Sequence, residues 1–511
     1  MRTASLPICA SAAFSLLATS VAAQVVAPKV ENVPIPAGVD VFNLDFDGIR
    51  KYASVQNFEI VGHSYFKIDQ RTPYAKGQGR SGPELGAGFN TVRVFDGIGY
   101  FAGYNSPSTL FGVMIADVRD PRAMKMLSFI PCNPGTRCGY LRVDRAKKLL
   151  IVGHDDDPRG NPTKVPAGEK TKPGWAFHDV SDPRNPKLLS FVPATPGGKT
   201  HGMEIDGRYL YGCGTFSPDM NREGLQIIDY GNPEEAKQIA TWHVTGQIKG
   251  EQFGPLNRNN PDGKPQLVQC HEINYHNDRL YLAWRDAGML VLDIKDRTAP
   301  KELANYDYVP PYHGGFLGAA HSSLPIVREP GEHPDIVVHT DEIFDCPQGF
   351  GRILDVSDLK NPEVVRGERP ANVQLLSTFR AEHVQDAFDP VKKEFVCPGT
   401  AAPNRSISNT THLPMLDYRS LSLVYVNWYD EACACSTFPI RRRRASSATI
   451  SRRASPRPGG RTATPARSGR IPTPICSTSP MATAAGSRCC AIRGRFRRGV
   501  QFRAPDRHEG L

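Results

Sequence analysis

Short apolar runs recur along the chain, each followed by an aspartate, another apolar residue and a turn rich in Asp, Pro and Asn. The copies occupy Val113–Pro121, Ala176–Pro183, Leu225–Pro233, Leu290–Asp296 and Ile353–Asp358. Their central aspartates lie roughly 50 to 65 residues apart, a period typical of solenoids and propellers. Because aspartates at strand ends cap turn amides, we expect these to be structural: Asp117, Asp179, Asp229, Asp293 and Asp355.

A further β-type segment precedes each aspartate phrase, as in Asp206–Tyr211 and Asp278–Leu282, and another follows it, as in Lys187–Val192. Short segments rich in Val, Ile, Leu, Tyr and Phe, divided by turn residues, predict four-stranded meanders. Repeats packed radially bury both faces of such sheets. The predicted fold is all-β, a β-propeller of six or seven four-stranded blades over residues 24–430, with the last blade or blades disrupted.

The first 23 residues have the plan of a cleavable secretory signal: Met1-Arg2, an apolar stretch from Leu6 to Val21, and Val21-Ala22-Ala23 before the expected cut. A short membrane anchor is the alternative. No later apolar run reaches the roughly 18 residues that span a bilayer. We therefore expect a periplasmic or secreted protein without a membrane span.

Six cysteines lie in the body of the chain, an even set that favours disulfides in an oxidising compartment. They are Cys132, Cys138, Cys213, Cys270, Cys346 and Cys397. Turn residues Asn133-Pro134-Gly135 separate the first two, so we expect a Cys132–Cys138 bond. Metal binding by thiolates is the alternative, but the body has no Cys-x-x-Cys.

The formal net charge of +10 belongs to the C-terminal end. From Ile440 onward there are 17 Arg, no Lys, and only Asp506 and Glu509 as acidic residues, which leaves 45 basic and 50 acidic residues before it. Residues 431–511 are rich in Arg, Pro and Ser, and this composition predicts a disordered tail. No aromatic platform accompanies the basic residues, so we expect no nucleic-acid binding.

A shifted reading frame accounts for this tail. Back-translation of Ala432–Phe438 and a shift by one base permits Leu-Arg-Val-Phe-Asp-Ile, a sixth copy of the repeated phrase. Trp428-Tyr429-Asp430 precedes it just as Trp284-Arg285-Asp286 precedes the fourth copy. The same shift from Met481 to Cys490 permits a glycine-rich turn and a strand. We interpret the tail as the product of a single-base deletion near Glu431; a genuine basic tail is the alternative.

Ala176–Pro186 and Ile353–Pro362 resemble the LVIVD repeat, whose family consists of exported bacterial β-propeller proteins. The resemblance covers roughly Gly88 to Asp430. It departs at Arg119–Ala123, where the second proline is missing, and at Tyr230-Gly231, where the usual Asp turn is altered. The resemblance implies the propeller fold but no single activity.

Histidines recur at the head of the first strand of successive units, and such strands line the axis of a propeller. Imidazoles that meet there suit Cu, Zn or Fe. The alternative is that each histidine only hydrogen-bonds the neighbouring blade. Selenium-binding proteins and methanethiol oxidases are similar in being propellers with central histidines, although none of their contiguous motifs is matched. The candidate metal ligands are His201, His271, His321, His383 and His412.

Carboxylates near these histidines form a second candidate set. Glu272 and Glu204 are the candidate catalytic bases, and Asp341 and Glu342 are further candidates. Asp286 and Asp430 share a Trp-x-Asp context that favours turn anchoring. The sequence thus predicts an exported propeller that binds a small-molecule or protein ligand in its central funnel. The alternative is a metal-dependent oxidoreductase or hydrolase that uses the ring of histidines.

Overall fold

The computed structural model describes residues 46–52, 59–64, 91–103, 112–156, 165, 167–251, 268–306, 320–327, 331–343, 349–359, 373–379, 387–389, 394–396, 411–416, 423–428, 432–437 and 490–493. Their regular secondary structure is almost entirely β-strand. The only helical segments among them are α1 (Phe46–Tyr52) and the short 3-10 helix η1 (Pro233–Glu235).

Five consecutive four-stranded antiparallel meanders make up most of the described structure. The first contains β2 (Thr91–Phe95), β3 (Ile98–Ala102), β4 (Gly112–Asp117) and β5 (Lys125–Pro131). The second contains β6 (Thr136–Asp144), β7 (Leu149–Asp156), β8 (Gly174–Asp179) and β9 (Lys187–Pro193). The third contains β10 (Thr200–Ile205), β11 (Tyr209–Gly214), β12 (Gly224–Asp229) and β13 (Lys237–Trp242).

The fourth and fifth meanders join into one eight-stranded sheet through a single pairing of Arg285 with Ala320. The fourth contains β14 (Val268–His276), β15 (Arg279–Arg285), β16 (Met289–Asp293) and β17 (Lys301–Tyr306). The fifth contains β18 (Ala320–Ile326), β19 (Ile336–Asp341), β20 (Gly351–Asp355) and β21 (Gln374–Phe379).

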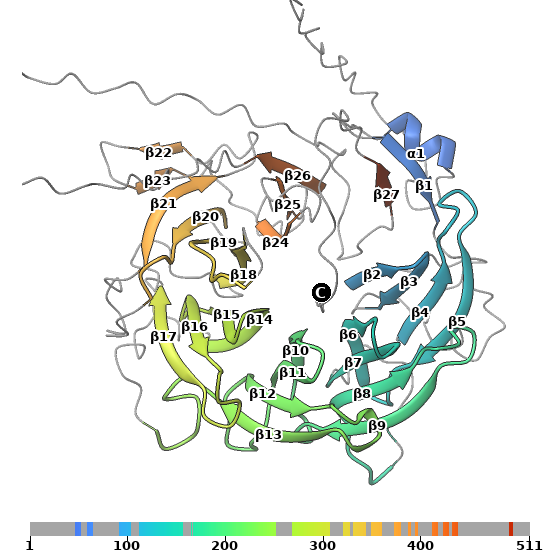
Figure 1. Ribbon diagram of the computed structural model, residues 1–511, viewed down its shortest axis with the longest axis horizontal. Helices are drawn as coiled ribbons and strands as arrows, with labels where there is room; N and C mark the ends of the chain where they lie inside the picture. The colour runs from blue at the N-terminus through green and yellow to red at the C-terminus, as the bar shows by residue number, and fades with distance from the viewer. Residues whose placement is uncertain are drawn as a thin grey trace, which may run out of the picture.

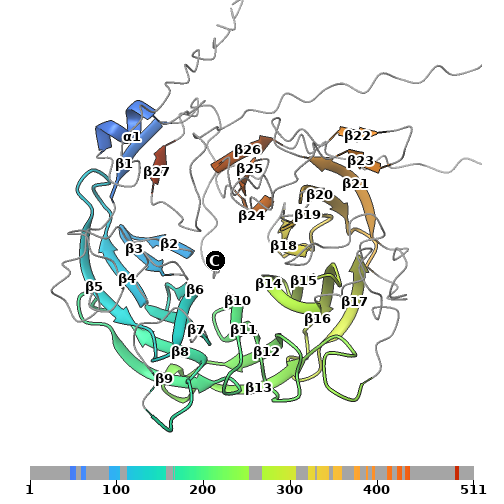
Figure 2. The same cartoon turned by 180° about the vertical axis from the view of Figure 1, so that it is seen from behind.

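The meanders stand around a common axis as the blades of a β-propeller (Figure 1). The first strands β6, β10, β14 and β18 lie toward the centre, whereas β5, β9, β13 and β17 form the rim; the view from behind shows the same order (Figure 2). The fold class predicted from the repeated phrase is confirmed. Residues at the same place in successive first strands are thereby brought together near the axis.

Apolar cores lie between neighbouring blades. One core packs Tyr211 and Leu225 of the third blade against Leu282 and Leu290 of the fourth, all fully buried. Equivalent clusters join the first blade to the second, the second to the third and the fourth to the fifth. Because successive blades bury their facing surfaces against each other, the spacing of the first strands is set by side-chain packing.

The repeated aspartates cap turns, as predicted. Asp179 accepts a hydrogen bond from the Ser181 amide at 2.8 Å, and Asp229 accepts one from the Gly231 amide at 2.8 Å. The same bond, from the amide two residues later, occurs at the other three aspartates, Asp117, Asp293 and Asp355. These residues end the third strand of each blade.

Sheets after the fifth blade have fewer strands. A three-stranded sheet contains β24 (Thr411–Leu416), β25 (Leu423–Trp428) and β26 (Ala432–Thr437). Two-stranded sheets pair β22 (Ala387–Asp389) with β23 (Glu394–Val396), and β1 (Glu59–His63) with β27 (Cys490–Arg493). Among the strands that are described, this region therefore departs from the four-stranded plan, as expected for a disrupted last blade.

Two disulfides are present among the described residues. Cys132–Cys138 is the bond expected from the turn residues between its cysteines, and Cys213–Cys270 joins β11 to β14. Cys346 and Cys397 lie outside the described residues. Within the described ranges, no helix is long and apolar enough to cross a membrane. The expected signal segment, residues 1–23, also lies outside these ranges.

Candidate metal centre

Strand register places four of the predicted histidines at equivalent positions. Pairing of each first strand with the second strand is interrupted at the histidine: between Thr200 and Met203, Val268 and Glu272, Ala320 and Ser322, and Thr411 and Pro414. Such bulges redirect a side chain out of the regular alternation of a strand. The shared irregularity gives His201, His271, His321 and His412 the same place in four successive units.

Three of these imidazoles form a buried row. The Nε2 atoms of His201 and His271 lie 2.8 Å apart, with ring centroids 4.3 Å apart. The rings of His271 and His321 are also 4.3 Å apart by their centroids. The exposed fractions are 7% for His201, 2% for His271 and 1% for His321. Blades three, four and five thus each contribute one imidazole to the same row.

His271 is neutral and holds its hydrogen on Nδ1. Burial lowers the pKa of His271 well below its usual value, and Arg285, His201 and His321 act in the same direction. Nδ1 lies 3.3 Å from the backbone oxygen of His321, and a carbonyl oxygen only accepts, so Nδ1 is the donor. Nε2 therefore carries a lone pair that points toward His201, which is the form of histidine that ligates metals.

A carboxylate reaches the other end of the row. Glu342 follows β19, and one of its oxygens lies 3.8 Å from Nε2 of His321. The same oxygen accepts a hydrogen bond from Arg285 at 2.6 Å in a buried ion pair. His271, His321 and Glu342 each offer a ligand atom, and these three atoms lie within 4.8 Å of one another. Glu342 was a secondary sequence candidate, and the structure places it beside the row.

The two candidate bases differ in their surroundings. Glu204 is held by Arg142, whose Nε lies 3.2 Å from one carboxylate oxygen, and it also accepts from the Ile205 amide at 2.9 Å. Glu272 is buried, and its Oε1 has no hydrogen-bond partner among the described residues. Burial raises the pKa of Glu272 to about 7, against the opposite effect of Arg142 and Arg93. Glu272 is therefore poised to exchange a proton near neutral pH.

Two predicted ligands are not seen at the row. His383 lies outside the described residues. His412 lies in β24 at the equivalent register position, and only its backbone is described. A further buried histidine that sequence reasoning missed, His339 in β19, contacts the Ser323 hydroxyl at 2.9 Å and lies 3.9 Å from Asp341. His339 lies in the second strand of its blade, and the sequence pattern identified only histidines that begin first strands.

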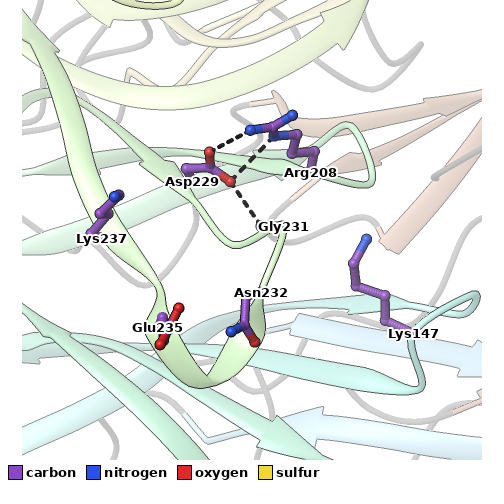
Figure 3. Close-up of a pocket in the computed structure, with 7 residues that line it drawn as sticks. All are labelled: Lys147, Arg208, Asp229, Gly231, Asn232, Glu235 and Lys237. Carbon is purple, nitrogen blue, oxygen red and sulfur yellow. Dashed lines mark hydrogen bonds and ion pairs between the residues drawn. The ribbon is translucent and has the colours of Figure 1, made fainter.

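A shallow pocket lies elsewhere, over the turns between the second and third blades (Figure 3). Its lining includes three basic side chains, but Arg208 is paired with Asp229 at 3.0 Å, and the Lys147 ammonium donates to the Gly207 carbonyl. No histidine lines this pocket. The pocket and the histidine row are therefore separate features.

The donor set at the row fits a transition-metal ion. Neutral imidazole nitrogens and a carboxylate oxygen are the ligands that Zn, Cu and Fe take in proteins. Two nitrogens bound to one ion at about 2.0–2.1 Å stand about 3 Å or more apart. The 2.8 Å separation of the His201 and His271 nitrogens is therefore within a few tenths of an ångström of that geometry.

The fold and this geometry define a β-propeller with a buried row of axial histidines. No family model matches the chain, so the resemblance to LVIVD repeats stays a prediction. No curated protein matches it either.

Solved structures with similar chain paths are distant. A protein from Lactobacillus plantarum is 10% identical, with 70% of this chain and 84% of that chain covered and a TM-score of 0.43. Sqt1 of Saccharomyces cerevisiae is 8% identical, with coverage of 74% and 76% and a TM-score of 0.40. A hypothetical selenium-binding protein from Sulfolobus tokodaii is 10% identical, with coverage of 40% and 51% and a TM-score of 0.30.

Proposed function

We propose that this chain is an exported β-propeller that holds a transition-metal ion in its axial histidine row and acts there on a small molecule. The observation that carries the proposal is the 2.8 Å approach of His201 Nε2 to His271 Nε2, in register with His321 of the next blade. A hydrogen bond to the neighbouring blade accounts for Nδ1 of His271, but it does not account for the approach of the two Nε2 atoms. The two disulfides fit an oxidising compartment outside the cytoplasm.

Copper, zinc or iron would be held within the row, where His201 and His271 bring their Nε2 atoms 2.8 Å apart and His321 and Glu342 continue the donor set beyond His271. Such an ion supplies Lewis acidity or, for copper and iron, electron transfer. Glu272 follows the central ligand directly in β14, and its unpartnered Oε1 is the atom that would take a proton from a substrate. Arg285 would hold Glu342 in place through their ion pair.

This assignment favours a metal-dependent oxidoreductase or hydrolase over a propeller that only binds a ligand. Burial of the three imidazoles favours an ion and a small substrate over a protein partner at this row, because a protein surface does not reach side chains that are at most 7% exposed.

Elemental analysis of the purified protein after incubation with Cu, Zn and Fe salts tests the proposal. We expect about one transition-metal ion per chain, and a large loss of that metal in His271→Ala. His276→Ala is the matched control, since His276 ends the same strand, away from the row, and contacts the Glu332 carbonyl. Absence of stoichiometric metal in the wild type, or equal metal content in His271→Ala, would reject the metal centre.

A further inference from the structure

The second blade breaks the histidine pattern at its place on the axis. In β6 the register interruption runs from Arg137 to Tyr140. Tyr140 pairs with Gly153 at the position that Glu272 takes opposite Ala283 in β14. The residue before it, which is histidine in β14, is Gly139 in β6. Gly139 has no side chain, and the next residue, Tyr140, contacts His201 with its own side chain.

Tyr140 extends the row of imidazoles by one aromatic ring. Its hydroxyl oxygen lies 2.8 Å from Nε2 of His201, and the two ring centroids are 4.5 Å apart. Tyr140 is only 7% exposed. The nitrogen of His201 that faces His271 is therefore also the nitrogen that faces the Tyr140 hydroxyl.

These contacts cannot both be ordinary hydrogen bonds. A ring nitrogen has either one hydrogen or one lone pair. The His271 nitrogen carries a lone pair, because its ring hydrogen is on Nδ1. If His201 Nε2 also carries a lone pair, two lone pairs face each other at 2.8 Å; if it carries hydrogen, one hydrogen serves two acceptors. A cation among the three atoms satisfies all of them at once.

Resting on the proposed function, we infer that the Tyr140 oxygen is a further ligand of the axial metal and completes a set with His201 and His271. The bond that forms is between the metal and the phenolate oxygen, and the bond that breaks is the phenol O–H, whose proton leaves to solvent. No change of oxidation state is involved. An anionic oxygen beside two neutral imidazoles favours Cu(II) or Fe(III) over a purely imidazole set.

Titration with copper(II) ions, followed by visible absorption and electron paramagnetic resonance, tests this ligand. A phenolate bound to Cu(II) produces an intense charge-transfer band in the visible range, which imidazole ligands alone do not. We expect this band in the wild type and its loss in Tyr140→Phe, which keeps the ring against His201 and removes only the oxygen. Because loss of an outer-shell partner already costs about tenfold or more in metal affinity, Tyr140→Phe should bind copper at least about tenfold more weakly.

Tyr281→Phe is the matched control, since Tyr281 is fully buried in β15 of the fourth blade. It should keep both the band and the affinity, and thermal melts of both variants verify that they are folded. Copper binding without the band, unchanged in Tyr140→Phe, would overturn the ligand assignment and leave the proposed metal centre standing. A wild-type protein that binds neither copper nor any other transition metal would overturn both.

Discussion

At the scale of the single residue, burial keeps the His154 side chain uncharged. The side chain lies in β7 at 3% exposure, and its Nδ1 accepts a hydrogen bond from the Asn133 amide at 3.1 Å. Burial lowers the pKa of His154 to about 3. The unfolded chain binds a proton at this residue below about pH 6.5, whereas the folded protein does not until about pH 3. His154 therefore makes stability rise with pH across this window.

We predict that His154→Gln weakens this dependence. One proton corresponds to about 1.4 kcal/mol per pH unit, so between pH 6.5 and 4.5 the variant should lose about 2 kcal/mol less of its free energy of unfolding than the wild type. Urea denaturation at both pH values measures the difference, and the comparison cancels the other titrating groups. Parallel losses in the two proteins would show that His154 becomes protonated without unfolding.

Position 202 requires a glycine, because the backbone of the neighbouring blade leaves no room for a side chain there. A Cβ atom at this position would lie 2.1 Å from the His271 carbonyl oxygen and 2.7 Å from Cα of Glu272. Strands β10 and β14 therefore approach each other only because residue 202 has no side chain. Gly202→Ala should cost about 1–3 kcal/mol of stability, as overpacking does, and should weaken metal binding by separating His201 from His271. Calorimetry of metal binding tests this; an unchanged dissociation constant would contradict it.

At the scale of the element, the Cys213–Cys270 disulfide links two strands of different blades directly beside a ligand. It joins β11 to β14, and Cys270 precedes His271. The separation along the chain is 57 residues, against 6 for Cys132–Cys138. Chain entropy then gives about 4 kcal/mol for the longer loop and about 2 kcal/mol for the shorter one.

We therefore predict that Cys213→Ser/Cys270→Ser lowers both the free energy of unfolding and the metal affinity. Cys132→Ser/Cys138→Ser should be destabilised less, because the chain loop that it releases is shorter, and should lose less metal affinity, because neither cysteine adjoins His271. Denaturant unfolding and metal titration of the two double variants provide the measurements. Equal metal affinity in both would mean that blade packing alone positions His271.

Strands and turns followed from the sequence because their signals are local. The apolar run and turn residues of Leu225–Pro233 predicted β12, and the amide two residues after Asp229 does donate to its carboxylate. The position of Glu342 beside the histidines and the pairing of Cys213 with Cys270 could not be predicted from the sequence. Their partners come from other strands or blades, and no spacing along the chain reports how far the interruption of pairing rotates a side chain toward the axis.

At the scale of the whole molecule, the register of β26 bears on the proposed frame shift. In complete blades the aspartate of the third strand pairs with the first residue of the second strand, as Asp229 does with Tyr209 and Asp293 with Arg279. In the three-stranded sheet, Thr437 pairs with Leu423, the first residue of β25. One base restored after codon 431 would allow an aspartate codon at position 437, at the register of the complete blades.

We predict that a gene with this base restored encodes a more stable protein. The apolar positions of β26 would then pack on β25, and the Arg-rich tail would be replaced by strand sequence that can complete the blade. Resequencing around codons 430 and 431, and thermal melts of the two products, test this. A confirmed reading frame together with no gain in melting temperature would identify the tail as genuine.

The sequence by itself determined the all-β class, the blade repeat, the turn aspartates and the Cys132–Cys138 bond, because each depends on residues that are close together along the chain. It also identified histidines that deserved a common role. Only the tertiary structure decided that His201, His271 and His321 form one buried row, with Tyr140 at one end and Glu342 at the other. Contacts between blades depend on packing across the axis and on bulges in the first strands, and neither leaves a local pattern in the chain.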